Sequence, residues 1–231
     1  MVSARKKAYF LPAGFVSIGT IVMLGISLGS TRWVSVKVTF HPNNTANATA
    51  FHATSYYGMF SGKYIVNRGI GMVDTDFQVI DQLFNTDGEK GTSQVAYAFQ
   101  MLFLVVGVLF AVIKCLFAFI NGLTNPYHNI QAPRGLYIWI SVCGGCCLLA
   151  LIIFPVAAQT SGMTEVFLDL IPEESISGYT YGTPYWLLLG ALLSCAVSMA
   201  ITYAYHNVHL EERQAATKAT SPATNTEVLM Y

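Results

Sequence analysis

Four long stretches of the chain are almost entirely apolar, and polar segments separate them. The apolar stretches run from Ala8 to Gly29, from Val95 to Ile120, from Leu136 to Ala158 and from Tyr185 to Tyr205. A helix rises ~1.5 Å per residue, so about 20 apolar residues cross a hydrocarbon core of ~30 Å. The pattern therefore predicts four transmembrane helices, at residues 8–29, 95–120, 136–158 and 185–205.

The first polar segment, residues 30–94, has a different periodicity. In RWVSVKVTF every second residue is apolar: Val34, Val36, Val38 and Phe40. Such alternation is typical of a half-buried β-strand. The later run SYYGMFSGKYIV is rich in aromatic and β-branched residues and contains Gly58 and Gly62, which favours further short strands joined by turns. We therefore expect a mainly α membrane protein, a four-helix bundle with a small β-sheet in its first loop; an irregular loop is the alternative.

Two other polar segments give weaker predictions. In residues 159–184, apolar side chains at helical spacing predict a short amphipathic extension of the third helix: Val166, Phe167, Leu170 and Ile171. Residues 206–231 are mostly polar and rich in Ala and Thr. They cannot bury enough apolar surface to fold alone, so we expect a disordered tail.

Composition agrees with a membrane protein. Of 231 residues, 54% are hydrophobic and only 10% are charged, which is unusual for a soluble domain of this size. The first apolar stretch exceeds the usual signal-peptide core of about 7–15 residues, so we interpret it as a retained signal-anchor helix. The formal net charge is zero and no basic stripe is present, which argues against nucleic acid as a partner.

The charges of the short segments predict the orientation. Residues 1–7 contain Arg5, Lys6 and Lys7, and residues 121–135 contain Arg134, whereas residues 159–184 contain acids and no Lys or Arg. The positive-inside rule places both termini and residues 121–135 in the cytoplasm. Residues 30–94 and 159–184 would then be extracellular. The first loop has glycosylation sequons at Asn43 and Asn47, in agreement with that side.

The stretch SVCGGCCLLA poses the question of a metal or redox site, because Cys143 and Cys146 have C-x-x-C spacing. All five cysteines lie in predicted helices: Cys115, Cys143, Cys146, Cys147 and Cys195. Thiolates and a dication are costly to bury without polar support, and the predicted helices contain no His or acid to help. Free cysteine is often buried as a small hydrophobe. We therefore expect packing, with no metal, no cofactor and no loop disulfide.

Small residues suggest helix-packing positions. They are Gly25 and Gly29 in a G-x-x-x-G pattern, the adjacent pair Gly144 and Gly145, and Gly190 with Ser194. Contacts within the bundle are the favoured interpretation, and a dimer contact is the alternative. Lys114 is the one charged residue in the predicted helices. Its position near the cytoplasmic end predicts that it extends to the headgroups.

The sequence predicts no catalytic residues, since the helices lack Asp, Glu and His. An enzyme or a secondary transporter is disfavoured for that reason. The C-terminus is a candidate partner site instead. Leu229 and the terminal Tyr231 present apolar side chains and a carboxylate that suit a PDZ groove on a cortical scaffold.

Several motifs along the whole chain resemble the clarins, within the claudin and peripheral-myelin-protein superfamily. These are KK before the first helix, Trp33, the motif at Tyr57, Gly58, Met59, Phe60 and Gly62, NPY at 125–127, PRGLYIW at 133–139, YWLLL at 185–189 and the terminal LMY. NPY, PRGLYIW and the absence of loop cysteines look closest to the third clarin paralogue.

The resemblance implies a non-enzymatic plasma-membrane protein with four spans, associated with hair cells, hearing, actin-rich protrusions and synapses. Unlike other clarins, this chain has no cysteine in the first loop. We expect a membrane organiser whose partners are the lipid bilayer, other membrane proteins, laterally or in trans, and a scaffold. An auxiliary ion-channel subunit and a claudin-like adhesion protein are the alternatives. Trp33, Tyr57, Gly58, Phe60 and Gly62 would shape the outer domain, either by maintaining its fold or by touching a partner.

Overall fold

The predicted four-helix bundle is confirmed in the structure, a computed structural model that describes residues 4–40, 51–67, 71–84, 91–124, 133–160 and 176–220. The long helices are α1 (Ala4–Gly29), α3 (Gly91–Leu123), α4 (Pro133–Thr160) and α6 (Thr183–Thr220). Each contains a stretch long and apolar enough to cross a membrane: Lys7–Gly29, Gln94–Leu123, Gly135–Val156 and Thr183–Val208.

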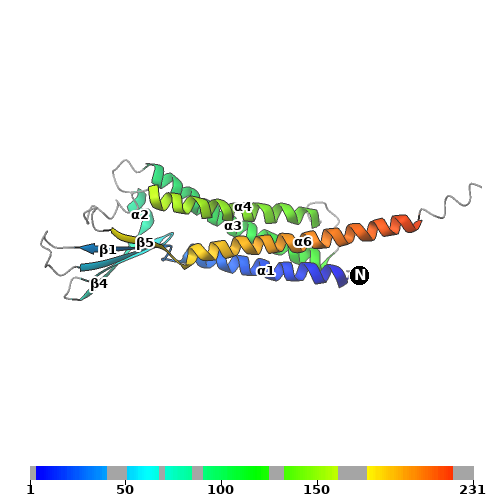
Figure 1. The fold of residues 1–231 in the computed structure, drawn as a ribbon, viewed down its shortest axis with the longest axis horizontal. Coiled ribbons are helices and arrows are strands. Elements are labelled where there is room, and N and C mark those ends of the chain that lie inside the picture. Colours follow the sequence, from blue (N-terminus) through cyan, green and yellow to red (C-terminus); the bar gives the residue numbers. More distant parts are fainter. Residues whose placement is uncertain are drawn as a thin grey trace, which may run out of the picture.

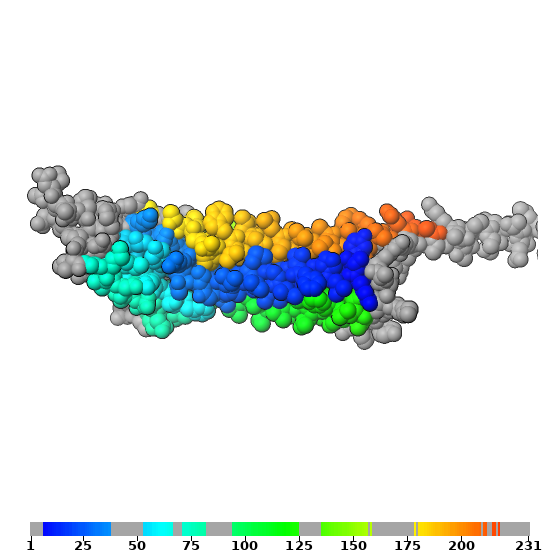
Figure 2. All heavy atoms as spheres, turned by 90° about the horizontal axis from the view of Figure 1, so that it is seen from below, coloured from blue at the N-terminus to red at the C-terminus, as the bar shows by residue number. Residues whose placement is uncertain are grey.

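The four long helices run side by side as an elongated bundle (Figure 1). Helix α1 packs against α3 and α6, and α4 packs against the same two helices. The helices therefore form a ring in the order α1, α3, α4, α6, with α3 diagonal to α6. Figure 2 shows α1 in blue beside α6 in yellow and orange along one face.

The predicted sheet is also confirmed, and it has five antiparallel strands. These are β1 (Val34–Phe40), β2 (Phe51–Tyr57), β3 (Ser61–Asn67), β4 (Met72–Gln78) and β5 (Ile176–Tyr181), in the spatial order β4-β3-β2-β1-β5. The first four strands follow one another as a meander. Burial follows the predicted period of two in β1, where Val34 and Val36 are buried and Lys37 is exposed.

Two elements were not predicted. Strand β5 comes from the second loop and pairs with β1, in the register Val34 opposite Tyr181 and Val36 opposite Tyr179. The short helix α2 (Val79–Phe84) follows β4 directly. The second loop thus completes a sheet that the first loop begins, and the two loops form one outer domain.

The sheet lies at one end of the bundle, and the N-terminal end of α1 lies at the other (Figure 1). Helix α6 runs from the sheet end past the N-terminus of α1. Both ends of the described chain are therefore remote from the sheet.

The predicted disorder of the tail is wrong for its first part. Helix α6 continues through Thr220, well beyond the predicted end at Tyr205. Extending an existing helix adds one hydrogen bond per ordered residue and avoids the cost of nucleation, and the Ala, Glu, Arg, Gln and Lys residues there are good helix formers. The amphipathic extension predicted at Val166 to Ile171 lies outside the described residues.

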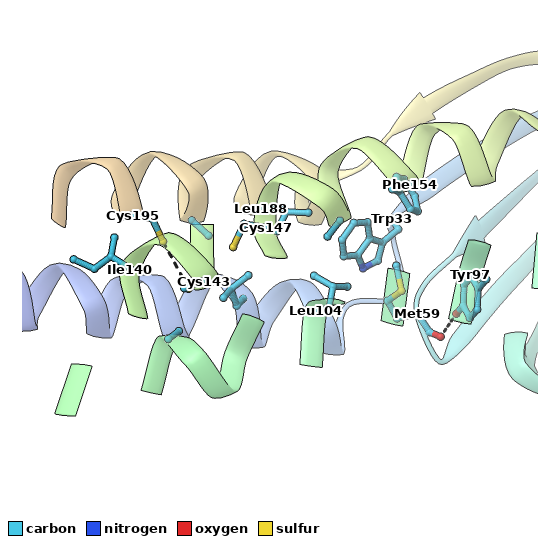
Figure 3. Packing of buried hydrophobic residues seen from close by; sticks show 14 of the residues in the cluster. Trp33, Met59, Tyr97, Leu104, Ile140, Cys143, Cys147, Phe154, Leu188 and Cys195 are labelled. Atoms are coloured by element: carbon cyan, nitrogen blue, oxygen red, sulfur yellow. Dashed lines mark hydrogen bonds between the residues drawn. The ribbon is translucent and has the colours of Figure 1, made fainter. Parts of the chain in front are cut away.

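A single core passes through the bundle into the base of the sheet. Its fully buried side chains include Phe10 and Leu24 of α1, Leu104 of α3, Ile140 of α4 and Leu188 of α6. Figure 3 shows Ile140, Leu188 and Leu104 at successive positions along the bundle, between the level of Cys195 and that of Trp33. Large apolar side chains on the outer faces are exposed, among them Val22, Leu109 and Leu193. Lipid tails would cover those faces.

Candidate functional site

Trp33 joins the sheet to the bundle. Its side chain is 1% exposed, and its indole Nε1 donates a hydrogen bond to the carbonyl oxygen of Ser27 at 2.7 Å. The ring packs against Phe154 of α4, with centroids 4.8 Å apart (Figure 3). The indole therefore contacts two helices while its backbone begins the sheet.

The backbone of Trp33 is hydrogen-bonded to the last residue of β2 and to Gly182, which directly follows β5. Its N–H donates to the carbonyl of Tyr57 at 2.7 Å, and its own carbonyl accepts from the N–H of Gly182 at 2.8 Å. Ser27 in turn donates from Oγ to the carbonyl of Pro184 at 3.0 Å. Because Trp33 and Ser27 are both buried, their hydrogen bonds connect the sheet to the helices away from water.

The turn after β2 needs glycine at Gly58. A Cβ there would lie 2.5 Å from the carbonyl oxygen of Ser30 and from the Cα of Thr31. The Gly58 N–H donates to Ser61 O at 3.1 Å, closing the turn. Next to it, Met59 is fully buried and its carbonyl accepts a hydrogen bond from the hydroxyl of Tyr97 on α3 (Figure 3). The turn therefore sits directly on the end of α3.

Gly62 has a different role from Gly58. A Cβ at Gly62 would lie 2.1 Å from Cζ of Phe77, because the Phe77 ring crosses the strand at this point. The Phe77 ring also packs edge-on against Tyr57, with centroids 5.8 Å apart. Tyr57 itself is buried. Gly62 therefore makes room for an aromatic pair on β2 and β4.

Phe60 differs from the rest of its motif. Its side chain is 42% exposed, whereas Tyr57, Gly58 and Gly62 are buried. The backbone carbonyl of Phe60 accepts a hydrogen bond from the N–H of Val79 at 3.0 Å. The motif thus combines structural positions with one exposed ring near the base of the sheet.

Strand β4 is one of the two edge strands of the sheet, and β5 is the other. Six of the seven residues of β4 are exposed, including the apolar Met72 at 77% and Val73 at 54%. Beside them, the exposed Lys63 of β3 forms an ion pair with Asp74. The hydrogen bond from Lys63 to Asp74 raises the pKa of the lysine above its usual value, and the charge of Asp76 adds to the effect. On the same face, Tyr56 of β2 pairs directly with Lys63, and the Arg32 guanidinium lies 5.1 Å from the centre of the Tyr56 ring.

The small residues predicted for helix packing fall into two groups. At Gly190 a Cβ would lie 3.0 Å from Sδ of Met23, and at Gly144 it would lie 3.6 Å from Cβ of Cys195. Gly190 therefore allows a close contact between α6 and α1, whereas Gly144 faces α6 at an ordinary van der Waals distance. In contrast, Gly25 and Gly29 are exposed, and a Cβ at either of them, or at Gly145, would meet nothing within 4 Å. Gly25 and Gly29 therefore do not form a packing face among the described helices, because their side of α1 points away from the bundle.

The predicted position of Lys114 is wrong. Its side chain is fully buried, and Nζ donates to Thr20 Oγ1 at 3.1 Å and to Cys195 Sγ at 3.3 Å. Helix α3 ends at Leu123, so Lys114 lies about 14 Å from that end at ~1.5 Å per residue. The lysine points into the bundle instead of extending along the lipid face to the headgroups.

The contacts of Lys114 extend to all four helices. Thr20 of α1 shares a hydrogen bond with Ser194 of α6, at 2.6 Å between hydroxyl oxygens. Cys195 Sγ lies 3.7 Å from Cys143 Sγ of α4 (Figure 3). Polar contacts between membrane helices are one of the forces that hold bundles together. This central polar cluster, Thr20, Lys114, Cys143, Ser194 and Cys195, is therefore a second candidate site.

The cysteines are all free and buried, so the predicted packing inside the helices is confirmed. Among the described residues, no group of three or more His, Cys, Asp or Glu side chains could hold a metal ion. Cys115 Sγ approaches the carbonyl of Gly14 at 3.8 Å, and Cys143 Sγ approaches that of Gly107 at 3.6 Å. The thiols therefore fill space between helices and make weak polar contacts.

Several predicted sites lie outside the described residues: the sequons at Asn43 and Asn47 and the C-terminal Leu229 and Tyr231. Conversely, sequence reasoning missed Ser27, Tyr97 and Gly182. A Cβ at Gly182 would lie 1.7 Å from Arg32 O. No local signal marks these three residues, since each makes its key contact with a distant part of the chain.

Known proteins resemble this chain over nearly its full length. A family model described as Clarin-2-like matches residues 5–199. Human Clarin-3 is 25% identical over 219 residues, covering 93% of both chains, and mouse Clarin-3 is 24% identical with the same coverage. Human Clarin-2 is 23% identical over 210 residues, covering 85% of this chain and 86% of its own. With four membrane-length helices, an outer sheet and a family match that covers most of its length, the chain belongs to the clarin family.

Proposed function

We propose that the protein is a non-enzymatic organiser of complexes in the plasma membrane, with both termini in the cytoplasm and a glycosylated sheet outside the cell. The helix bundle anchors it. The sheet contacts the outer part of another membrane protein, and the C-terminal residues bind a cortical scaffold. Hearing-related and actin-linked complexes are the contexts that family membership suggests.

The observation that supports this proposal best is the exposed edge strand β4. Monomeric proteins rarely leave an edge strand with adjacent large apolar side chains uncovered, because such an edge can pair with other chains. Met72 and Val73 are adjacent along β4 and both are exposed, one on each face of the sheet. The ion pair of Lys63 and Asp74 beside them adds a polar rim, which is a common feature of protein interfaces.

A rigid connection to the bundle supports the same function. Because Trp33 contacts two helices and hydrogen-bonds to β2 and to the residue after β5, a partner held by the sheet would be held at a fixed angle to the membrane. An organiser needs this property, since it sets the position of its partners.

The test is quantitative proximity labelling in polarised cells. The intact protein is compared with the double variant Met72→Ser/Val73→Thr, and Thr75→Ser on the same exposed strand serves as the matched control. We expect the double variant to reach the cell surface and to lose a defined set of extracellular or membrane neighbours. An unchanged set would contradict the role of β4.

The tail is tested separately by deleting Val228 to Tyr231. Loss of labelled proteins that contain PDZ domains or bind actin would support the scaffold contact. Retention of those proteins would show that the C-terminal residues do not make this contact. A neighbour set dominated by ion-channel subunits would favour the auxiliary-subunit alternative, which co-expression currents would then test. Aggregation of expressing cells would favour adhesion in trans.

A further inference from the structure

The buried amino group of Lys114 faces no carboxylate within the bundle. None of the four spans contains Asp or Glu. A charge at this depth is costly unless a partner compensates it. The two groups that accept hydrogen bonds from Nζ are the hydroxyl of Thr20 at 3.1 Å and the thiol of Cys195 at 3.3 Å. Of these two, only a thiol becomes an anion under physiological conditions.

We propose that Cys195 is a thiolate paired with the ammonium group of Lys114, and that this pair makes Cys195 a site of oxidation by hydrogen peroxide, with Cys143 as the second thiol. The pair forms when the proton of Cys195 Sγ moves to an uncharged Nζ. The net charge in the bundle does not change, and the attraction between the two ions, whose Nζ and Sγ atoms lie 3.3 Å apart, offsets the cost of burying each of them. This inference is independent of the proposed organising function.

The geometry favours Cys143 as the second thiol. Its sulfur lies 3.7 Å from that of Cys195, and a disulfide has a sulfur–sulfur distance of about 2.05 Å. Helices α4 and α6 are in direct contact at this level, since a Cβ at Gly144 would lie 3.6 Å from Cβ of Cys195. A change of side-chain rotamer with a small helix shift is enough to close the gap. Cys147 lies one turn further along α4 in the same cluster and is the competing candidate (Figure 3).

The oxidation balances with peroxide as the only added reagent. The Cys195 thiolate attacks one oxygen of hydrogen peroxide, an S–O bond forms and the O–O bond breaks. The hydroxide that leaves takes a proton from Lys114 and becomes water. The sulfur of Cys143 then displaces the hydroxyl group of the Cys195 sulfenic acid, which leaves as water with the Cys143 proton. Two thiols lose two electrons, and one peroxide becomes two waters.

The disulfide would link α4 covalently to α6 at the centre of the bundle. At the same time Lys114 would lose its anion and its charge. The polar cluster that connects the four helices would therefore be rearranged, and the relative position of α4 and α6 would be fixed.

The experiment uses the full chain in lipid nanodiscs treated with hydrogen peroxide. Free thiols are alkylated on unfolding, disulfides are then reduced and alkylated with an isotopically heavy reagent, and each cysteine is quantified by mass spectrometry. We expect heavy label to enter Cys143 and Cys195 together, ahead of Cys115 and Cys146. In Lys114→Met the rate should fall about tenfold or more, because a neutral thiol reacts far more slowly than a thiolate.

The matched control is Cys115→Ala, which removes a buried thiol next to Lys114 in the sequence and should leave the rate at Cys195 unchanged. Equal rates at all five cysteines, or an unchanged rate in Lys114→Met, would overturn the proposal.

A second variant keeps the test decisive if Lys114→Met fails to fold. In Cys143→Ala, a dimedone probe should trap sulfenic acid at Cys195, where the intact protein gives a disulfide. A disulfide between Cys147 and Cys195 in the intact protein would overturn the assignment of Cys143. No dimedone adduct at Cys195 in a monodisperse Cys143→Ala sample would overturn the reactive thiolate.

Discussion

The indole N–H of Trp33 donates to the backbone carbonyl of Ser27 at 2.7 Å, across the boundary between the sheet and the membrane helices. Ser27 lies in the last turn of α1, where carbonyl groups lack partners within the helix. One side chain of the sheet therefore caps the helix that precedes it. Because both groups are buried, the bond cannot be replaced by water without opening the junction.

The first prediction concerns this bond. Trp33→Phe keeps an aromatic ring and removes the N–H, leaving Ser27 O unpaired, so we expect the free energy of unfolding to fall by about 1–3 kcal/mol. Trp33→Ala should cost more, about 3–5 kcal/mol, because it also leaves a cavity against Phe154.

Thermal unfolding with a bulky thiol-reactive fluorogenic dye measures both variants, since all five cysteines are buried and a dye of this size reaches them only on unfolding. A melting temperature of Trp33→Phe equal to that of the intact protein would show that the bond does not hold the junction.

The second prediction compares glycines. Gly182→Ala would force a Cβ into Arg32 O, so the junction must shift, at a cost of about 1–3 kcal/mol. Gly25→Ala is the matched control, because its Cβ meets nothing within 4 Å. We expect a lower melting temperature and reduced surface delivery for Gly182→Ala only. An equal fall in melting temperature in both variants would mean that the close contact between Gly182 and Arg32 O is not the cause of the loss.

Such contacts mark the limit of what the sequence could predict. The alternation from Val34 to Phe40 predicts β1 because it reports local burial. Strand β5 contains Gly178 and pairs with β1 from across two membrane helices, so only the folded chain brings the two strands together. The need for glycine at position 182 follows from the same long-range contact.

The error at Lys114 has a similar cause. The position of Lys114 along its own helix gives only its depth in the membrane, whereas its partners Thr20 and Cys195 lie 94 and 81 residues away on other helices. A lone lysine in an apolar run gives no sign of which way it points. The packing of the cysteines was predictable, since their flanking residues are uniformly apolar, but their contact with Lys114 was not.

The third prediction tests the central polar cluster through Thr20. Thr20→Val keeps the shape and removes the hydroxyl that contacts Lys114 and Ser194. Hydrogen bonds between membrane helices contribute about 0.6–2 kcal/mol, so we expect a loss of that order. Thr20→Ser retains the oxygen and should lose less. Calorimetry or the same dye assay ranks the two, and a reversed order would mean that the methyl group of Thr20 is the important part.

The fourth prediction concerns pH at the outer edge of the sheet. The hydrogen bond to Asp74 raises the pKa of Lys63 above its usual value. The pair therefore favours the folded sheet throughout the neutral range, and this contribution is lost as the pH rises through the folded-state pKa of the lysine. In Asp74→Asn the titration of Lys63 should move to lower pH, as measured by NMR of methylated lysines. A small change in stability at neutral pH is expected, because exposed pairs are screened by water.

The most direct measurement for the central claim is site-specific photo-cross-linking from the edge strand in living cells. A photoreactive phenylalanine analogue replaces Met72, and the same analogue at Val22, on the lipid-facing side of α1, is the control. The account predicts a discrete cross-linked protein partner at position 72 and none of the same mass at position 22. Normal surface delivery without any protein adduct at position 72 would contradict the claim that the outer sheet holds a partner.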